Sequence, residues 1–364
     1  RVREHLQVEV PLRHLFEGPT VESLAEVVEQ TRQAGETALA APLVPCSRTA
    51  PLPLSFAQQR LWFLEQLEPG STAYSMPSAV RLRGALDVPV LRRSLNELVQ
   101  RHESLRTIFA QDADEPVQVI LPTLELPVPL VDLQSLPAAE REDEMRRLRA
   151  QEAKEPFDLA VGPLFRAQVI RMEAEDHVLL LTFHHVISDG WSMGIFFREL
   201  EIIYQALSEG QTPALPPLPV QYADYAVWQR EVLQGERLEQ EVDYWREYLQ
   251  GPLPILQLPT DFPRPATQSH RGAREGVMLG AELQAGLHAL SQRSGTTLFM
   301  TLLAIFQSLV HRWSGQDDLC VGFPSAGRTR AETEGLIGFF INTLTVRTRL
   351  AADSGFQGLL DQVK

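Results

Sequence analysis

The chain has 364 residues, and its 47 acidic side chains outnumber 33 basic ones to give a formal net charge of −14 at pH 7. This length and a hydrophobic content of 44% predict two or three compact units and exclude an intrinsically disordered chain. The acidic balance argues against nucleic-acid binding. The sequence has no run of about 18 apolar residues, which predicts a cytoplasmic protein without a membrane span. Its two cysteines, Cys46 and Cys320, fit neither a disulfide framework nor a thiolate metal site.

Residues 1–30 predict two short helices. Thr20 has the position of an N-cap for the second, and apolar Leu24 and Val28 follow at helical spacing. Two short helices bury too little surface to fold alone, so we expect them to close a larger helical domain that lies upstream. Residues 31–52 are rich in Ala, Pro and Thr and predict an extended linker.

A new domain is predicted to begin with a capped helix. Ser55-Phe-Ala-Gln supplies an N-cap with a Gln at the third helical position, which predicts a helix over Phe56–Leu67. Asp87 and Pro89 open another helix, which ends near Arg101.

The middle of the chain predicts a β-hairpin followed by a helix. The apolar runs Phe165–Arg171 and His177–His184 are joined by a short acidic turn, and the second run is so apolar that we expect a central strand. Helical spacing resumes at Met193 and stops before the proline cluster Pro213–Pro219, which we expect to cross between two lobes.

The rest of the chain also mixes helices with strands, and the whole order favours an α/β (α+β) fold of sheets covered by helices. The predicted elements are helical regions over Tyr222–Gln250, Ala281–Ser294 and Thr297–Trp313, and strands over Leu319–Phe323 and Asn342–Leu350.

The segment His184-His-Val-Ile-Ser-Asp-Gly190 lies where the central strand runs into a turn. Neighbouring strand residues point to opposite faces, so His184 and His185 cannot chelate one metal together. One histidine is predicted to face a cleft, where its ordinary pKa of about 6.5 suits proton transfer. Gly190 would let a substrate approach the main chain. The alternative is two histidines at the edge of the core followed by an ordinary Asp-Gly turn.

Five ordered motifs carry a resemblance. They are Ser55–Trp62, Arg101–Thr107, His184–Ser192, Tyr222–Trp228 and Ile337–Thr343. With these motifs the sequence resembles the condensation domains of non-ribosomal peptide synthetases, which belong with chloramphenicol acetyltransferase to the His-His-x-x-x-Asp-Gly acyltransferase superfamily. Residues 1–30 are similar to the closing helices of a peptidyl carrier domain.

The resemblance implies two chloramphenicol-acetyltransferase-like lobes in a V, with a tunnel between them. We expect the N-lobe over residues 53–215 and the C-lobe over residues 216–364. The family's domain continues beyond the fifth motif, so the C-lobe is expected to be incomplete. The carrier's Gly-Gly-His-Ser motif is not in the sequence, so this chain is not expected to carry a phosphopantetheine arm.

The reaction that the resemblance implies is peptide-bond formation, in which the amine of an acceptor aminoacyl thioester attacks a donor thioester. His185 is the candidate to accept or to position the amine proton, and both roles stay open. Gly190 presents its backbone N–H to the reacting thioester. His184 and Asp189 are interpreted as structural supports.

An arginine is expected to pair with Asp189 and hold the loop. Arg312, at the end of a predicted helix, is the first candidate, and Arg328 in the following loop is the competitor.

Three further residues are candidates for the tunnel or the lobe junction. Arg106 could also be an exposed arginine at a helix end, Trp228 an aromatic that packs a helix, and Asn342 a residue that forms hydrogen bonds at a strand end.

The continuation Ser192–Leu200 resembles condensation domains that accept an L-configured donor. Heterocyclising relatives differ in the third motif, and the first motif here resembles that of condensation domains more than that of epimerising relatives.

A catalytically silent scaffold that docks carriers or recruits an enzyme is the alternative, and its expected mark is a damaged third motif. The resemblance implies no metal, nucleotide or redox cofactor, only phosphopantetheine on upstream and downstream carrier domains, with no nucleic acid or membrane partner. It places the chain in antibiotic or siderophore biosynthesis.

Overall fold

The computed structural model describes residues 6, 8, 20–33, 41–113, 115–266, 272–273, 275–350 and 355–364. The chain forms two compact units. The main unit comprises Ala40–Gln234 and Ala326–Asn342, and the second unit comprises Arg1–Leu39, Gly235–Ser325 and Thr343–Lys364.

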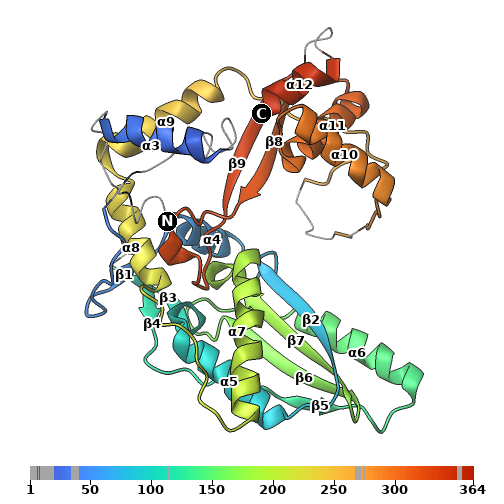
Figure 1. Ribbon diagram of the computed structural model, residues 1–364. Helices are drawn as coiled ribbons and strands as arrows, with labels where there is room; N and C mark the ends of the chain where they lie inside the picture. Colours follow the sequence, from blue (N-terminus) through green and yellow to red (C-terminus); the bar gives the residue numbers. More distant parts are fainter. Residues whose placement is uncertain are drawn as a thin grey trace. The chain divides into compact units, whose positions relative to one another are not determined.

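A four-stranded sheet is the centre of the main unit (Figure 1). Its strands lie in the order β2 (Ser75–Arg83), β7 (Asp176–His184), β6 (Phe165–Glu173) and β5 (Leu130–Asp132). The pairs β2–β7 and β6–β7 are antiparallel, and β5 runs parallel to β6. The predicted hairpin is therefore confirmed, and β7 is central, with every residue after Asp176 buried.

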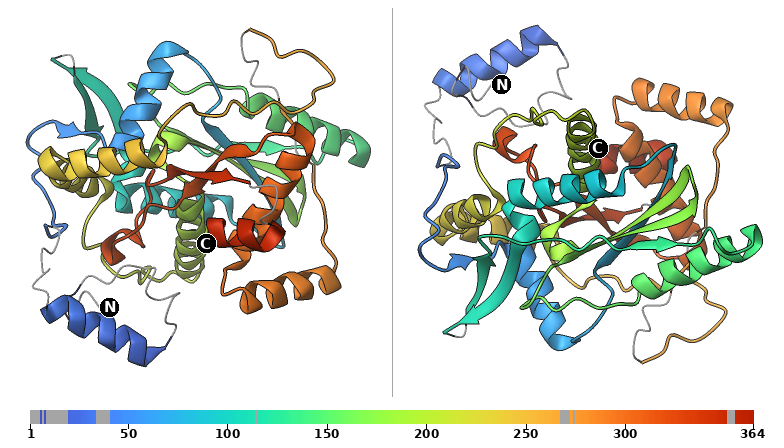
Figure 2. Two further views of the ribbon diagram at one scale, coloured as in Figure 1. Left: turned by 90° about the horizontal axis from the view of Figure 1, so that it is seen from above. Right: turned by 90° about the horizontal axis from the view of Figure 1, so that it is seen from below.

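Helices cover both faces of this sheet because its strand residues are apolar on both sides. Helices α5 (Val88–Arg101) and α7 (Gly190–Ser208) lie side by side on one face, and α6 (Ala138–Glu152) packs on the other (Figure 1, Figure 2). Phe183 of β7 stacks on Phe165 at 4.6 Å between ring centroids. The C-terminal end of β7, which carries His184, is thus fixed by a packed core.

The capped helices form as predicted. In α4 (Phe56–Leu67) Ser55 Oγ accepts a bond from Gln58 N, and Gln58 Oε1 accepts one from Ser55 N, both at 3.1 Å. Asp87 caps α5 through Val90 N at 3.0 Å.

A short turn, η1 (Glu103–Arg106), follows α5 and leads into a second sheet. Its strands lie in the order β1 (Leu52–Pro53), β4 (Glu115–Ile120) and β3 (Thr107–Asp112).

A returning segment, residues 326–342, joins the main unit from far along the chain and contains η3 (Ala331–Thr333). It packs against α8 (Tyr222–Val232) so closely that a Cβ at Gly338 would overlap the ring of Tyr222. Gly327 has φ +66°, and a Cβ there would overlap the carbonyl of Phe340. Both positions therefore require glycine.

The compact units do not divide at the predicted lobe boundary between residues 215 and 216. Pro216 O accepts a bond from Arg101 Nη2 at 2.6 Å, and Leu215 packs against the main core, so the proline cluster stays on the main unit. The unit runs on to Gln234. Gly235, at φ +56°, also divides the predicted long helix into α8 and α9 (Gly235–Tyr248).

The second unit contains the remaining elements. These are α3 (Val21–Gln33), α9, α10 (Ala281–Arg293), α11 (Leu298–Ser314), β8 (Asp318–Ser325), β9 (Asn342–Arg349) and α12 (Gly355–Val363). Strands β8 and β9 pair, and α11 packs on α12. Thr20 Oγ1 accepts a bond from Ser23 N at 3.1 Å, which confirms the predicted cap of α3.

The first of the two helices predicted for residues 1–30 lies, apart from residues 6 and 8, outside the described residues. In the described part of the chain no single helix is long and apolar enough to span a membrane, and only α10 and α11 together, bent by 105°, reach that length and composition.

Candidate active site

The His-His motif lies where the central strand passes through a tight turn into a helix. His184 ends β7, His185 begins the 3₁₀ turn η2 (His185–Ile187), and Gly190 begins α7. Asp189 caps α7, since its Oδ1 accepts a bond from Ser192 N at 2.8 Å. This strand–turn–helix geometry fixes the motif's backbone.

His184 points into the protein interior, where the resemblance places a structural support. Its side chain is 2% exposed, its ring lies edge-on to Phe157 at 5.9 Å, and its Nδ1 accepts a bond from Val186 N at 3.1 Å. Burial, assisted by the neighbouring His185, lowers the pKa of His184 to about 4. His184 is therefore neutral near pH 7 and supports the turn.

His185 is half-buried, and a single polar contact orients its ring. Its Nδ1 lies 2.8 Å from the carbonyl oxygen of Ser188. A carbonyl can only accept, so Nδ1 carries the proton and Nε2 keeps its lone pair in the neutral ring. The ring also contacts Phe339 of the returning segment at 4.9 Å between centroids.

Asp189 is fully buried, and both of its carboxylate oxygens are occupied. Oδ1 accepts bonds from Ser192 N and from Ser192 Oγ at 2.7 Å, and lies 3.3 Å from Arg328 Nη2. Oδ2 accepts a bond from Phe340 N at 3.0 Å. The carboxylate thus joins the start of α7 to the returning segment.

Arg328, the second of the two arginines that the sequence offered, is the partner of Asp189. Its side chain is 2% exposed, its Nη2 donates to Ser192 Oγ at 2.8 Å, and its Nη1 donates to Leu336 O at 2.8 Å. Its guanidinium carbon lies 4.0 Å from the ring centroid of Phe340. Burial lowers the pKa of Arg328, although Asp189 acts in the opposite direction.

The prediction that Arg312 pairs with Asp189 is wrong. Arg312 lies on α11 of the second unit and is exposed. The buried face of this helix includes Gln307 and Val310, and Arg312 falls outside that stripe. A helix-end position in the sequence does not determine which face an arginine occupies.

Arg106 and Trp228 both bond to backbone carbonyls of the main unit. Arg106 Nη1 donates to Leu121 O at 2.5 Å, so this residue holds η1 and is not an exposed arginine at a helix end. Trp228 Nε1 donates to Ala41 O at 2.5 Å, and Arg330 lies 5.0 Å from its ring.

Asn342 and Gly190 are both exposed. Asn342 begins β9. A Cβ at Gly190 would meet nothing within 4 Å, so packing of this chain does not require glycine there.

Sequence reasoning missed two residues of this site, Ser192 and Phe339. Ser192 Oγ contacts Asp189 and Arg328 and accepts a bond from Gly338 N at 3.1 Å. Their only signal was membership of the third and fifth motifs, because periodicity cannot show that these motifs meet.

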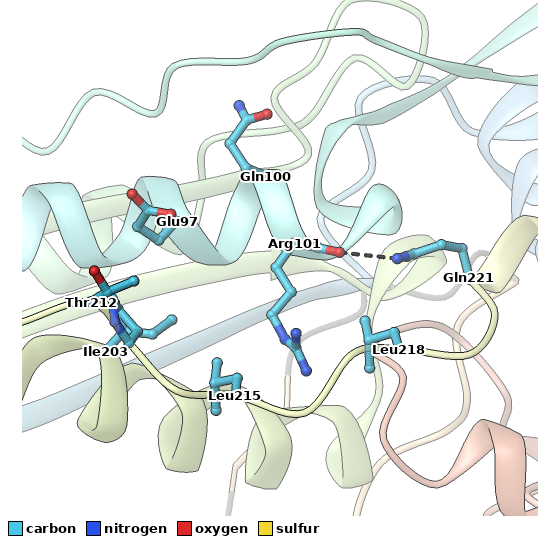
Figure 3. A pocket seen from close by; sticks show the side chains of 9 residues that line it. Glu97, Gln100, Arg101, Ile203, Thr212, Leu215, Leu218 and Gln221 are labelled. Atoms are coloured by element: carbon cyan, nitrogen blue, oxygen red, sulfur yellow. Dashed lines mark hydrogen bonds between the residues drawn. The ribbon is translucent and has the colours of Figure 1, made fainter. Parts of the chain in front are cut away.

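A separate groove, lined by both polar and apolar residues, lies on the main unit between α5, α7 and the proline cluster (Figure 3). Gln221 Nε2 donates to the carbonyl of Arg101 at its edge, at 3.0 Å. Beside it, His102 Nε2 lies 2.8 Å from the Glu199 carboxylate, and Arg101 Nε donates to that carboxylate at 3.0 Å. The described residues contain no group of three or more His, Cys, Asp or Glu side chains that could hold a metal.

Arg328→Gln is expected to lower the free energy of unfolding by about 3–5 kcal/mol, because it leaves the buried Asp189 carboxylate without its cation. The matched variant Arg312→Gln should change it by less than about 0.5 kcal/mol, since Arg312 is exposed. Denaturant unfolding of both variants measures the difference. Equal losses in the two would contradict this assignment.

His184 should make stability depend on pH. The pKa of His184 is about 4 in the folded chain and 6.5 in the unfolded reference. Its contribution to the free energy of unfolding is therefore complete above pH 6.5 and is lost as the pH falls toward 4. The loss is about 3 kcal/mol. His184→Asn keeps an acceptor for Val186 N but does not titrate, so its stability should approach that of the wild type as pH falls through this window. Parallel stability curves would show that His184 titrates normally.

Comparisons with known proteins agree with this geometry. The Condensation domain family model matches residues 49–364. One of the subunits of linear gramicidin synthase from Brevibacillus parabrevis is 53% identical over 365 residues, which is 100% of this chain and 5% of that protein. This chain thus spans a small part of the relatives that it matches.

Solved structures share the fold. The X-domain from teicoplanin biosynthesis, solved in a complex with OxyB, matches with a TM-score of 0.79 and 31% identity over 88% of this chain and 70% of that one. The first condensation domain of the CDA synthetase matches with a TM-score of 0.72 and 22% identity over 86% and 74%. Condensation domains are acyltransferases that form amide bonds. The present chain belongs to this family of condensation domains.

Proposed function

We propose that this chain forms peptide bonds in non-ribosomal peptide synthesis. The observation that carries the proposal is the half-buried His185, whose Nδ1–H donates to Ser188 O and leaves the Nε2 lone pair available beside the start of α7. The donor and acceptor are aminoacyl or peptidyl thioesters on the phosphopantetheine arms of two carrier domains. Family membership and the intact third motif support this assignment.

The reaction makes one bond and breaks one. The acceptor's amine nitrogen attacks the donor's thioester carbonyl carbon, a C–N bond forms, and the C–S bond breaks to release the donor arm's sulfur. The proton lost by the amine goes to that sulfur. His185 Nε2 accepts this proton, or holds the amine by accepting a hydrogen bond from it.

The negative charge that develops on the carbonyl oxygen needs a donor. Gly190 is the first residue of α7, and the first N–H groups of an α-helix have no partner within the helix. The positive end of the helix dipole also favours an anion there. We therefore assign the backbone N–H of Gly190 to the reacting oxygen.

Asp189, Ser192 and Arg328 act as positioning residues in this account. They hold the start of α7 to the returning segment that carries Phe339, and Phe339 contacts the His185 ring. Asp189 is already saturated with donors and fully buried, so it has no free oxygen for a substrate proton.

The partners follow from the same proposal. An upstream carrier supplies the donor, for which an L configuration is proposed from Ser192–Leu200, and a downstream carrier supplies the acceptor. Residues 1–30 are proposed to be the closing helices of the upstream carrier. The family model begins at residue 49, whereas the match to the linear gramicidin synthase subunit covers the whole chain, residues 1–30 included.

The X-domain's complex with OxyB raises a second candidate, a silent scaffold that recruits a partner enzyme. The intact His185, Asp189 and Gly190 favour catalysis over this alternative.

His185→Ala is expected to slow dipeptide formation about 10²–10⁴-fold, because it removes the acceptor of the amine proton. The assay supplies both loaded carriers to the full-length protein and follows the intact mass of the acceptor carrier. A folded wild type that transfers nothing with several aminoacyl pairs would favour the silent scaffold.

Gly190→Ala should fold normally, since a Cβ meets no atom within 4 Å, yet it should slow the same reaction by crowding the thioester. The matched control is Gly194→Ala on the same helix, where a Cβ also meets nothing within 4 Å. Equal rates in the two variants would remove Gly190 from the reacting centre.

A further inference from the structure

The segment at the start of the main unit, residues 41–53, packs against the rest of that unit. Most of residues 41–53 fall in the predicted extended linker, and they lie on the main unit along much of their length. Leu43 is 5% exposed and belongs to the apolar cluster of Tyr222, Tyr225 and Phe340. At its other end, Leu52–Pro53 pairs with β4 as strand β1.

A set of charged contacts lies between these two anchors. Arg48 Nη1 donates to Asp224 Oδ1 at 2.6 Å, and Arg48 Nη2 donates to Glu103 Oε2 at 2.8 Å. Cys46 N also donates to Asp224 Oδ1 at 2.8 Å. Asp224 is 1% exposed, so its charge would be costly to bury without these donors.

Glu103 belongs to the second motif, whereas Asp224 belongs to the fourth motif, to which the reaction mechanism gives no role. Asp224 accepts the two bonds just described, and its Oδ2 accepts a third from Gln221 N at 2.7 Å within the cap of α8. Trp228, one turn further along α8, donates from Nε1 to Ala41 O. Helix α8 thus forms hydrogen bonds with the segment at Ala41, at Cys46 and at Arg48.

We propose that residues 41–53 are a docked strap and that Asp224 and Trp228 of the fourth motif are its receptor. Ala41 is then a fixed point on the main unit. If the proposed function holds, docking shortens the length of chain available to move an upstream carrier domain.

Cys46 reports whether the strap is docked. Burial and the Asp224 carboxylate raise its pKa to about 11, while Arg48 lowers it. In Arg48→Ala, a strap that stays docked would keep Asp224 beside the thiol without the opposing cation, and alkylation would slow. A strap that is released would return the thiol to its ordinary pKa of about 8.5, and alkylation would speed up.

The test is alkylation of the full chain with iodoacetamide at pH 8, with Cys320 as the internal reference. We expect Arg48→Ala to speed the modification of Cys46 at least about tenfold relative to Cys320. The matched control is Arg147→Ala, which removes an exposed arginine paired with Glu144 and should leave the ratio unchanged. Slower or unchanged modification in folded Arg48→Ala would overturn the role of Arg48.

Hydrogen exchange of wild-type protein gives a test that needs no variant. Peptides within residues 42–50 should exchange at least about tenfold more slowly than an unstructured peptide, and Trp228→Phe should reduce this protection. Unprotected exchange in the wild type would overturn the strap itself. Neither measurement needs peptide-bond formation, so a protected strap in a protein without activity would contradict only the proposed function.

Discussion

Asp189 places a full negative charge where no water reaches it, and the surrounding structure is arranged to satisfy that charge. A buried carboxylate is costly unless it is paired and fully hydrogen-bonded. Here it takes two bonds from Ser192, one from Phe340 N and the cation of Arg328. These donors come from the start of α7 and from the returning segment, so one carboxylate holds both in place.

This arrangement leads directly to the reacting group. The turn that Asp189 closes also carries His185 and the carbonyl of Ser188 that orients its ring. The returning segment supplies Phe339, which contacts that ring. The third and fifth motifs are therefore one structural unit, in which the buried charge sets the geometry and the half-buried imidazole performs the chemistry that we propose.

Local patterns predicted local structure well. The capping box at Ser55 and the hairpin that ends at His184 follow from short-range spacing, and the structure has both. Such patterns failed where distant segments meet. Arg328 lies 139 residues from Asp189 along the chain, and nothing in its local sequence distinguishes it from Arg312.

The same limit explains the domain boundary and the linker. A proline cluster predicts an extended path but not the surface on which it lies, and Arg101 holds this one to the main unit. Alanine, proline and small polar residues likewise predict a linker. They do not show that Leu43 reaches an apolar cluster formed by residues more than a hundred positions away.

The central claim is that Ser188 fixes the tautomer of His185 and leaves Nε2 free to meet the amine. Nitrogen-15 NMR of the imidazole at a pH where the ring is neutral measures this directly. The account predicts a protonated Nδ1 and a bare Nε2 for His185. A proton on Nε2 would mean that this nitrogen cannot accept one, and it would contradict the mechanism at its first step.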